Sequence, residues 1–178
     1  MTMLELVKHL NFAVVVLFTL LYLYQGFYVV VGLVRRRWQD RHQPSRLHRF
    51  AVVVSARNEE GVIGELLESL NRQNYPKELL DLYVVADNCT DDTSDIARSA
   101  GATVYERFNN VQVGKGYALQ TLLGHLEQDY PAGFDGYIVF DADNILDPGY
   151  IAAMNRTFSQ GHDIVTSYRN SKNYGDNW

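Results

Sequence analysis

Cysteine is almost absent from this chain of 178 residues. Cys89 is the single cysteine, so no disulfide can form within the chain and no cysteine-rich zinc site can be built. Two glycine-rich nucleotide-binding patterns are also missing. The chain has no Gly-x-x-x-x-Gly-Lys-Ser/Thr segment, and no Gly-x-Gly-x-x-Gly segment follows its first predicted strand. These absences exclude a disulfide-stapled domain and a Walker A site, and they disfavour a dinucleotide cofactor.

Positive charge is scarce in the larger part of the chain. Residues 51–178 contain nine Lys and Arg against nineteen Asp and Glu, whereas residues 35–50 contain six Arg and one Asp. An acidic globular part lacks the positive face that neutralises the phosphates of duplex DNA, so we expect no nucleic-acid partner. Charged residues make up 21% of the chain and aromatic residues 12%, a composition that excludes a disordered chain.

Charge is missing altogether from Leu10 to Val34. These 25 residues exceed the roughly 20 that a helix needs to span the hydrocarbon core of a bilayer. Three arginines, Arg35–Arg37, follow at once, and the positive-inside bias then places the downstream chain in the cytoplasm. A cleaved signal peptide is the alternative, but its charges would precede the apolar core. We therefore expect a single span over about residues 10–34, within an N-terminal segment 1–34, in the cell membrane.

A basic juxtamembrane linker is expected over residues 35–49. It could lie on anionic lipid headgroups, or it could be a solvated linker whose charge only sets the topology. The sequence leaves both alternatives open. Residues 50–178 are then expected to form one globular domain.

Apolar runs alternate with amphipathic stretches in this domain, a pattern typical of an α/β fold. Continuous apolar strands separated by helices indicate a mostly parallel, Rossmann-like sheet that helices cover on both faces. Helices are expected near residues 62–70, 93–100, 118–126 and 147–160. Strands are expected at residues 49–54, 82–86, 102–105, 137–140 and 163–168.

Three of these strands end in polar clusters. The clusters occupy Ser55–Gly61, Asp87–Asp92 and Asp141–Asn144. One such cluster is ordinary turn chemistry. In open parallel sheets, however, ligands bind beyond the carboxyl ends of the strands. Three clusters on one edge therefore predict a site for a polar ligand.

The third cluster begins with two carboxylates, Asp141 and Asp143, directly after an apolar strand. Carboxylate oxygens suit a hard cation such as Mg²⁺ or Mn²⁺, which usually keeps open positions for substrate phosphates. The alternative is a turn that caps the next helix. Asp147 and Pro148 are already predicted to supply that cap, so Asp141 and Asp143 are expected to be available for a metal ion.

Two further positions point to a nucleotide. Asp87 ends its strand where a carboxylate can accept a hydrogen bond from a nucleobase N–H, the alternative being a cap on the following helix. Lys115, between Gly114 and Gly116, opens a helix whose N-terminus could receive a phosphate. Taken alone, Lys115 is more readily explained as a solvated surface lysine.

The ordered set of motifs resembles the family 2 glycosyltransferases, which have the GT-A fold. The matching segments are V-V-V-S-A-R-N-E-E, V-V-A-D-N-C-T-D-D-T, G-K-G-Y-A-L and F-D-A-D-N, from about Phe50 to the end of the chain. Together with the N-terminal span, they are similar to the membrane-bound branch that includes cellulose, hyaluronan and poly-N-acetylglucosamine synthases.

The resemblance implies a role for each matching residue. Ser55, Ala56, Arg57 and Glu59 would lie against the base and ribose of a nucleotide-sugar, and Asp87 would pair with the base. Lys115 would lie near the nucleotide, and Asp141 and Ala142 would also belong to the nucleotide-sugar site. Asp141 and Asp143 would hold the donor through a divalent metal ion, Mg²⁺ or Mn²⁺.

The implied activity is transfer of a sugar from a nucleotide-sugar, with a UDP-sugar favoured, to a glycan or lipid acceptor. The reaction would be metal-dependent and inverting. The family's general base and its Q/R-x-x-R-W motif would lie beyond Trp178, so the chain is expected to be truncated after the donor-binding half. Two alternatives stay open. One is a membrane-anchored fragment that binds a nucleotide or a partner protein without turnover, and the other is a nucleotidyltransferase.

Overall fold

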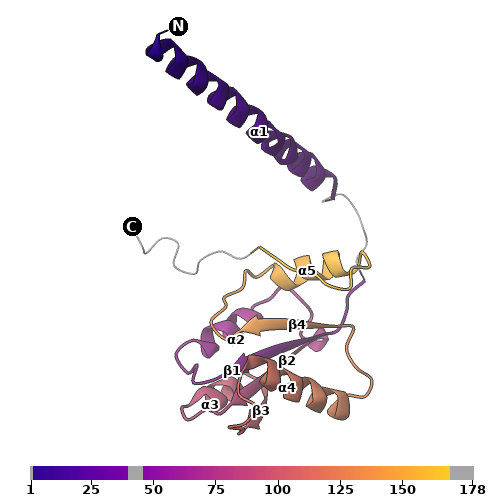
Figure 1. The fold of residues 1–178 in the computed structure, drawn as a ribbon. Coiled ribbons are helices and arrows are strands. Elements are labelled where there is room, and N and C mark those ends of the chain that lie inside the picture. The colour runs from indigo at the N-terminus through magenta and orange to yellow at the C-terminus, as the bar shows by residue number, and fades with distance from the viewer. Residues whose placement is uncertain (1, 40–45, 169–178) are drawn as a thin grey trace. The chain divides into compact units, whose positions relative to one another are not determined.

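The computed structural model describes residues 2–39 and 46–168 (Figure 1). The chain divides into two units, Met1–Pro44 and Ser45–Trp178. The first contains one helix, α1, over Met3–Gln39. Its stretch Met3–Val34, of mean hydropathy 2.1, is long and apolar enough to cross a membrane, a test that a signal sequence also passes. The helix continues five residues past the predicted span, so the first part of the expected linker is helical.

The second unit is built on a four-stranded sheet in which every neighbouring pair is parallel. Its strands are β1 (Phe50–Ala56), β2 (Leu80–Asp87), β3 (Thr103–Arg107) and β4 (Gly136–Asp141). They are arranged in the order β3-β2-β1-β4, with β1 paired to β2 on one side and to β4 on the other. All strands therefore end at the same edge of the sheet, as the sequence predicted.

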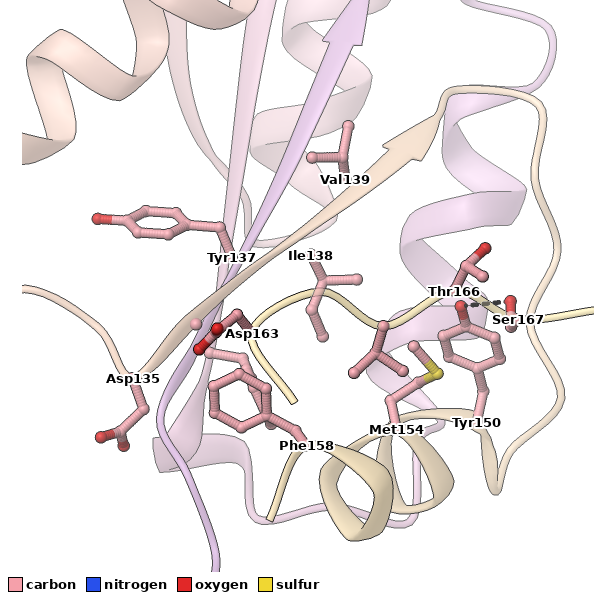
Figure 2. Close-up of a pocket in the computed structure, with 13 residues that line it drawn as sticks. Asp135, Tyr137, Ile138, Val139, Tyr150, Met154, Phe158, Asp163, Thr166 and Ser167 are labelled. Atoms are coloured by element: carbon pink, nitrogen blue, oxygen red, sulfur yellow. Dashed lines mark hydrogen bonds between the residues drawn. The ribbon is translucent and has the colours of Figure 1, made fainter. Parts of the chain in front are cut away.

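The free edge of β4 borders a groove of about 570 Å³ (Figure 2). Helix α5 (Tyr150–Phe158) and the segment after it form the other wall, where the Tyr150 hydroxyl lies 2.9 Å from the Ser167 hydroxyl. The strand predicted at residues 163–168 is absent, and that prediction was wrong. An apolar run forms a strand only with a hydrogen-bonded neighbour, and this segment lies across the groove from β4 with Ile164 93% exposed.

Helices cover both faces of the sheet, as predicted. α2 (Ile63–Asn71), α3 (Thr93–Ser99) and α5 lie on one face, and α4 (Lys115–Asp129) lies on the other (Figure 1). A short 3₁₀ helix, Lys77–Leu79, precedes β2. Alternate residues of β1 enter the two cores, Val52 and Val54 facing α2 and Ala51 and Val53 facing α4.

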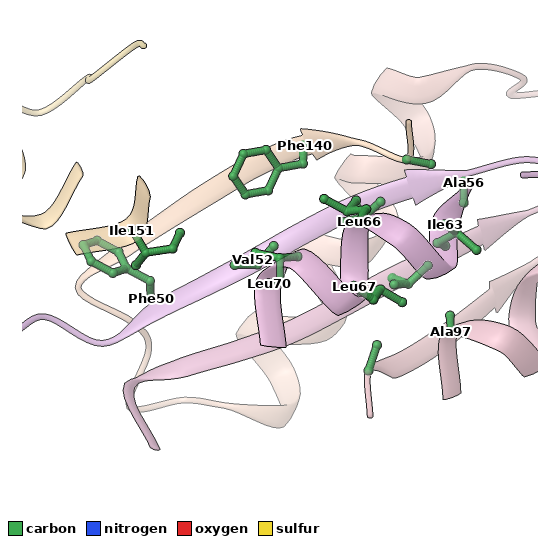
Figure 3. Close-up of a cluster of buried hydrophobic side chains, with 14 of the residues drawn as sticks. Phe50, Val52, Ala56, Ile63, Leu66, Leu67, Leu70, Ala97, Phe140 and Ile151 are labelled. Carbon is green, nitrogen blue, oxygen red and sulfur yellow. The ribbon is translucent and has the colours of Figure 1, made fainter. Parts of the chain in front are cut away.

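The core between the sheet and α2 is formed by large apolar side chains (Figure 3). Leu66 and Leu67 of α2 are fully buried against Val52 and Phe140 of the sheet. Truncating such a leucine to alanine costs about 2–5 kcal/mol of stability. This packing fixes the position of β1 relative to β4. These two strands lead into the polar clusters Ser55–Gly61 and Asp141–Asn144.

One buried amide fixes the entry of the chain into the second unit. The Asn155 side chain is 1% exposed, and its Oδ1 accepts hydrogen bonds from the His48 backbone N–H and the Tyr75 hydroxyl. Its Nδ2 donates to the Arg46 carbonyl at 3.0 Å. Residues 46–48 are thereby tied to α5. The same burial makes the Asn155-Arg156-Thr157 sequon inaccessible in the folded protein.

The predicted capping of α5 needs correction. The helix begins at Tyr150, and its N-cap is Gly149 rather than Asp147. Asp147 instead closes the turn before the helix, its Oδ1 accepting from the Gly149 N–H at 2.8 Å and its carbonyl accepting from the Tyr150 N–H. Asp and Pro favour turns as well as first helical turns, and here the turn is formed.

Candidate functional site

The polar clusters after β1, β2 and β4 converge with the start of α4 on one cavity of about 380 Å³. Eight of the nine residues that line it were singled out from the sequence as ligand-binding or metal-binding positions, and the ninth is the glycine at the start of α4. The exception among the predicted residues is Ala56, which is 1% exposed and packs in the core. The lining residues are Ser55, Arg57, Glu59, Asp87, Gly114, Lys115, Asp141, Ala142 and Asp143.

This cavity is smaller than the groove beside β4, yet it is the better candidate. The groove is lined mainly by apolar and hydroxyl side chains, with two acidic residues, Asp135 and Asp163 (Figure 2). Among the described residues that line it there is no lysine or arginine. The smaller cavity lies at the carboxyl ends of parallel strands, where such folds bind ligands, and it gathers both charge signs.

Lys115 and Asp141 form an ion pair across the cavity. Lys115 is the first residue of α4, and Gly114 before it has φ +126° and ψ 158°, a conformation that only glycine adopts without strain. The glycine thus aims the lysine at the end of β4. Asn144 supports the same turn, with its Oδ1 accepting from the Asp141 N–H and its Nδ2 donating to Asp143 Oδ1 at 3.1 Å.

Asp87 is held by a residue that the sequence did not single out, Arg107 at the end of β3. The Arg107 Nη1 donates to Asp87 Oδ1 at 2.6 Å, and the two side chains are 7% and 4% exposed. The other arginine nitrogen, Nη2, donates to the Gln112 carbonyl at 2.6 Å. Asn88 Nδ2 also donates to Asp87 Oδ1, so both of these hydrogen bonds reach the same carboxylate oxygen.

The loops after β1 and β2 are joined by hydrogen bonds. Asn58 Oδ1 accepts from the Thr90 N–H at 2.8 Å, and the Glu59 N–H donates to the Thr93 hydroxyl at 2.8 Å. The Thr93 hydroxyl in turn donates to Asp91 Oδ1, and this hydrogen bond lowers the pKa of Asp91. Much of the second polar cluster therefore builds the loops that shape the cavity.

The donor atoms at the end of β4 suit a hard divalent cation. Asp141 and Asp143 supply carboxylate oxygens to the cavity, and the described residues that line it carry no sulfur or imidazole. Among the residues that the structure describes, no three His, Cys, Asp or Glu side chains gather closely enough to hold a metal ion. The residues fit a weakly held Mg²⁺ or Mn²⁺ that takes the remaining oxygens from water or ligand, and they do not fit a closed structural site.

Sequence comparisons identify relatives that transfer sugars. The "Procollagen galactosyltransferase 1-B" of Xenopus laevis is 37% identical over 76 residues, covering 43% of this chain and 12% of the relative. The "4,4'-diaponeurosporenoate glycosyltransferase" of Staphylococcus aureus is 42% identical over 68 residues, covering 38% of this chain and 17% of the relative. The chain thus spans less than a fifth of the length of these two curated relatives.

Solved structures share the fold. TarS of S. aureus in complex with UDP has a TM-score of 0.50 at 23% identity, with 63% of this chain and 32% of that chain covered. The mannosyltransferase PcManGT of Pyrobaculum calidifontis, in complex with GDP-Man and Mn²⁺, has a TM-score of 0.51 at 22% identity, with 79% and 41% covered. Residues 48–178 match the family described as "Glycosyltransferase like family 2". Since this match takes in the whole sheet and every residue of the cavity, the chain belongs to the family 2 glycosyltransferases.

Proposed function

We propose that this chain binds a nucleotide-sugar, with a UDP-sugar favoured, and takes part in transferring the sugar to a glycan or lipid acceptor. The observation that carries the proposal is the convergence of three strand-end loops and the start of α4 on one cavity. Its lining combines a buried carboxylate, Asp87, with two basic side chains and the Asp141 and Asp143 pair. The carboxylate could accept a hydrogen bond from a nucleobase, a basic side chain could bind the diphosphate, and the aspartate pair could hold a metal ion.

Asp87 is the proposed partner of the nucleobase. The hydrogen bonds from Arg107 and Asn88 both reach Oδ1, which leaves Oδ2 to accept from a base N–H. Arg107 orients the carboxylate through a charge-assisted hydrogen bond. Ser55, Arg57 and Glu59, on the adjoining loop, are proposed to lie against the base and ribose.

Lys115 and the first turn of α4 are proposed to bind the diphosphate. The first N–H groups of a helix have no partner within the helix, and the helix dipole favours an anion there. Gly114 carries no side chain that could cap these groups. Lys115 adds a full positive charge at the same place and stabilises the charge that develops on the leaving diphosphate.

Asp141 and Asp143 would hold the divalent cation, with Ala142 between them keeping the turn packed at 4% exposure. When bound, the metal ion would supply Lewis-acid neutralisation of the diphosphate. The PcManGT complex with GDP-Man and Mn²⁺ and the TarS complex with UDP support this proposal, since both ligands are bound on the same fold. We assign no general base among the described residues. Inversion at the anomeric carbon stays an implication of the resemblance.

The membrane-bound branch of the family is part of the proposal. The stretch Met3–Val34 is proposed to span the cell membrane, with the arginines that follow it keeping the globular unit in the cytoplasm. Residues 35–49 would then be the juxtamembrane linker, and residues 50–178 the donor-binding domain. The family assignment favours sugar transfer over the nucleotidyltransferase alternative.

The test is to measure donor binding and sugar transfer side by side. The full chain in detergent micelles is titrated with UDP, GDP and ADP by calorimetry, and membranes that contain it are incubated with radiolabelled UDP-sugars. We expect UDP to bind most tightly and label to enter a glycan or lipid fraction. Binding without transfer would support the binding-only alternative. If no nucleoside diphosphate binds, the proposal is wrong.

A further inference from the structure

The ion pair between Lys115 and Asp141 joins two groups that the proposed function assigns to different ligands. Asp141 is to hold the metal ion, and Lys115 is to hold the diphosphate, yet the two side chains contact each other here. A cation and the lysine ammonium are therefore competitors for the same carboxylate. A metal ion can therefore bind Asp141 only when Lys115 has moved away.

We infer that Lys115 takes the place of the metal ion on Asp141 in the donor-free protein and transfers to the diphosphate when the donor binds. The inference rests on the proposed function and deepens it. It means that the site binds its metal ion together with the donor rather than before it. Free Mg²⁺ or Mn²⁺ would then not occupy the site unproductively.

The geometry favours such an exchange. The Lys115 and Asp141 side chains are 47% and 43% exposed, so the pair is solvated and breaks at little cost. Lysine carries a compact charge on a flexible four-carbon stem, and Lys115 begins a helix between two glycines, Gly114 and Gly116. Gly116 has no atom within 4 Å of the place of its absent Cβ, so the surface is open directly beside Lys115 in the chain.

The buried ion pair that includes Asp87, another residue of the cavity lining, differs from this one. Asp87 and Arg107 are 4% and 7% exposed, and Arg107 is also bound to the Gln112 carbonyl, so this pair is fixed. The Asp87–Arg107 pair is thus permanent, whereas the Lys115–Asp141 pair can exchange its partners. The exchangeable pair is the one that contains a predicted metal ligand.

The test measures Mn²⁺ affinity by electron paramagnetic resonance, with the full chain in detergent, first without nucleotide and then with saturating UDP. The parent should bind Mn²⁺ weakly alone and more tightly with UDP. Lys115→Gln should bind Mn²⁺ more tightly than the parent without nucleotide, by up to about five-fold, the range of an exposed ion pair. Its gain in Mn²⁺ affinity on adding UDP should shrink. Lys115→Arg keeps the positive charge beside Asp141, so its nucleotide-free Mn²⁺ affinity should stay below that of Lys115→Gln.

A double-mutant cycle with Asp141→Asn separates competition at this carboxylate from a general effect of charge. In the Asp141→Asn background, Lys115→Gln should bring no gain in Mn²⁺ affinity. The inference is overturned if Lys115→Gln leaves nucleotide-free Mn²⁺ binding unchanged or weaker, or if its gain persists in the Asp141→Asn background. A parent that shows no coupling between Mn²⁺ and UDP would instead refute the proposed function, and the inference with it.

Discussion

Replacing Arg107 tests the structure around the cavity directly, because the loss of stability depends on how deeply the Arg107–Asp87 ion pair is buried. In Arg107→Met the Asp87 carboxylate would lose its partner in a place where 4% of its side chain is exposed. Breaking a buried pair in this way costs about 3–5 kcal/mol. The charge-assisted hydrogen bond to the Gln112 carbonyl is lost as well. Arg107→Lys should cost less, because the charge on Asp87 remains compensated.

The assay is thermal unfolding of the full chain in detergent, followed by far-UV circular dichroism. One kcal/mol shifts the midpoint of a domain of this size by roughly 3–6 °C, so Arg107→Met should melt more than about 9 °C below the parent. Arg98→Met is the matched control, since Arg98 pairs with Asp95 and Glu106 at 46% exposure and should cost less than about 1 kcal/mol. Equal small shifts for both variants would refute the claim that Asp87 is held by a desolvated ion pair.

Three further changes probe the loops and the topology. Gly114→Ala should destabilise the protein by about 1–3 kcal/mol in a thermal melt, because φ is +126° there, whereas Gly116→Ala inside the helix should be neutral or stabilising; similar melts for both would contradict this. Thr93→Val should raise the pKa of Asp91 in a carboxyl NMR titration, since it removes the hydroxyl that lowers it. Because the pKa of Asp91 is lowered in the folded state, ionised Asp91 stabilises the fold at pH values above its unfolded-state pKa, and this stabilisation is lost as the pH falls through the folded-state pKa. If the stability of Thr93→Val falls with acid just as that of the parent does, the contact does not have this effect. A reporter fused after Trp178 should be active in the cytoplasm, and activity only outside would overturn the proposed topology.

The elements that the sequence predicted correctly are those with a local signal. Four apolar runs gave the four strands, because side chains such as Val52 and Val84 must be buried on a parallel sheet covered by helices. The strand expected at residues 163–168 has the same local signal, but no hydrogen-bonded neighbour at the β4 edge. Pairing is a non-local property, and composition does not report it.

The candidate site was predictable to the same extent. Strand ends place Asp87 and Asp141 at one edge of the sheet, and the start of α4 brings Lys115 to the same cavity. Arg107 was missed because one arginine at the end of a strand gives no signal until its neighbour strand is known. Asp147 was assigned a cap on similar local grounds, and the structure uses it in the preceding turn. For both Arg107 and Asp147, the sequence does not tell which group each side chain contacts in the folded protein.

The central claim is that Asp141 and Asp143 bind a divalent cation together with a nucleoside diphosphate. The most direct measurement is calorimetric titration of the full chain with UDP, in Mn²⁺ and again in chelator, for the parent and for Asp143→Ala. The parent should lose about five-fold or more in UDP affinity on chelation, the lower end of typical coupling between two ligands. Asp143→Ala should bind UDP weakly in both conditions and melt like the parent, since Asp143 is exposed. If Asp143→Ala keeps the full gain from Mn²⁺, or if the parent is indifferent to the chelator, the two aspartates form a turn and not a metal site.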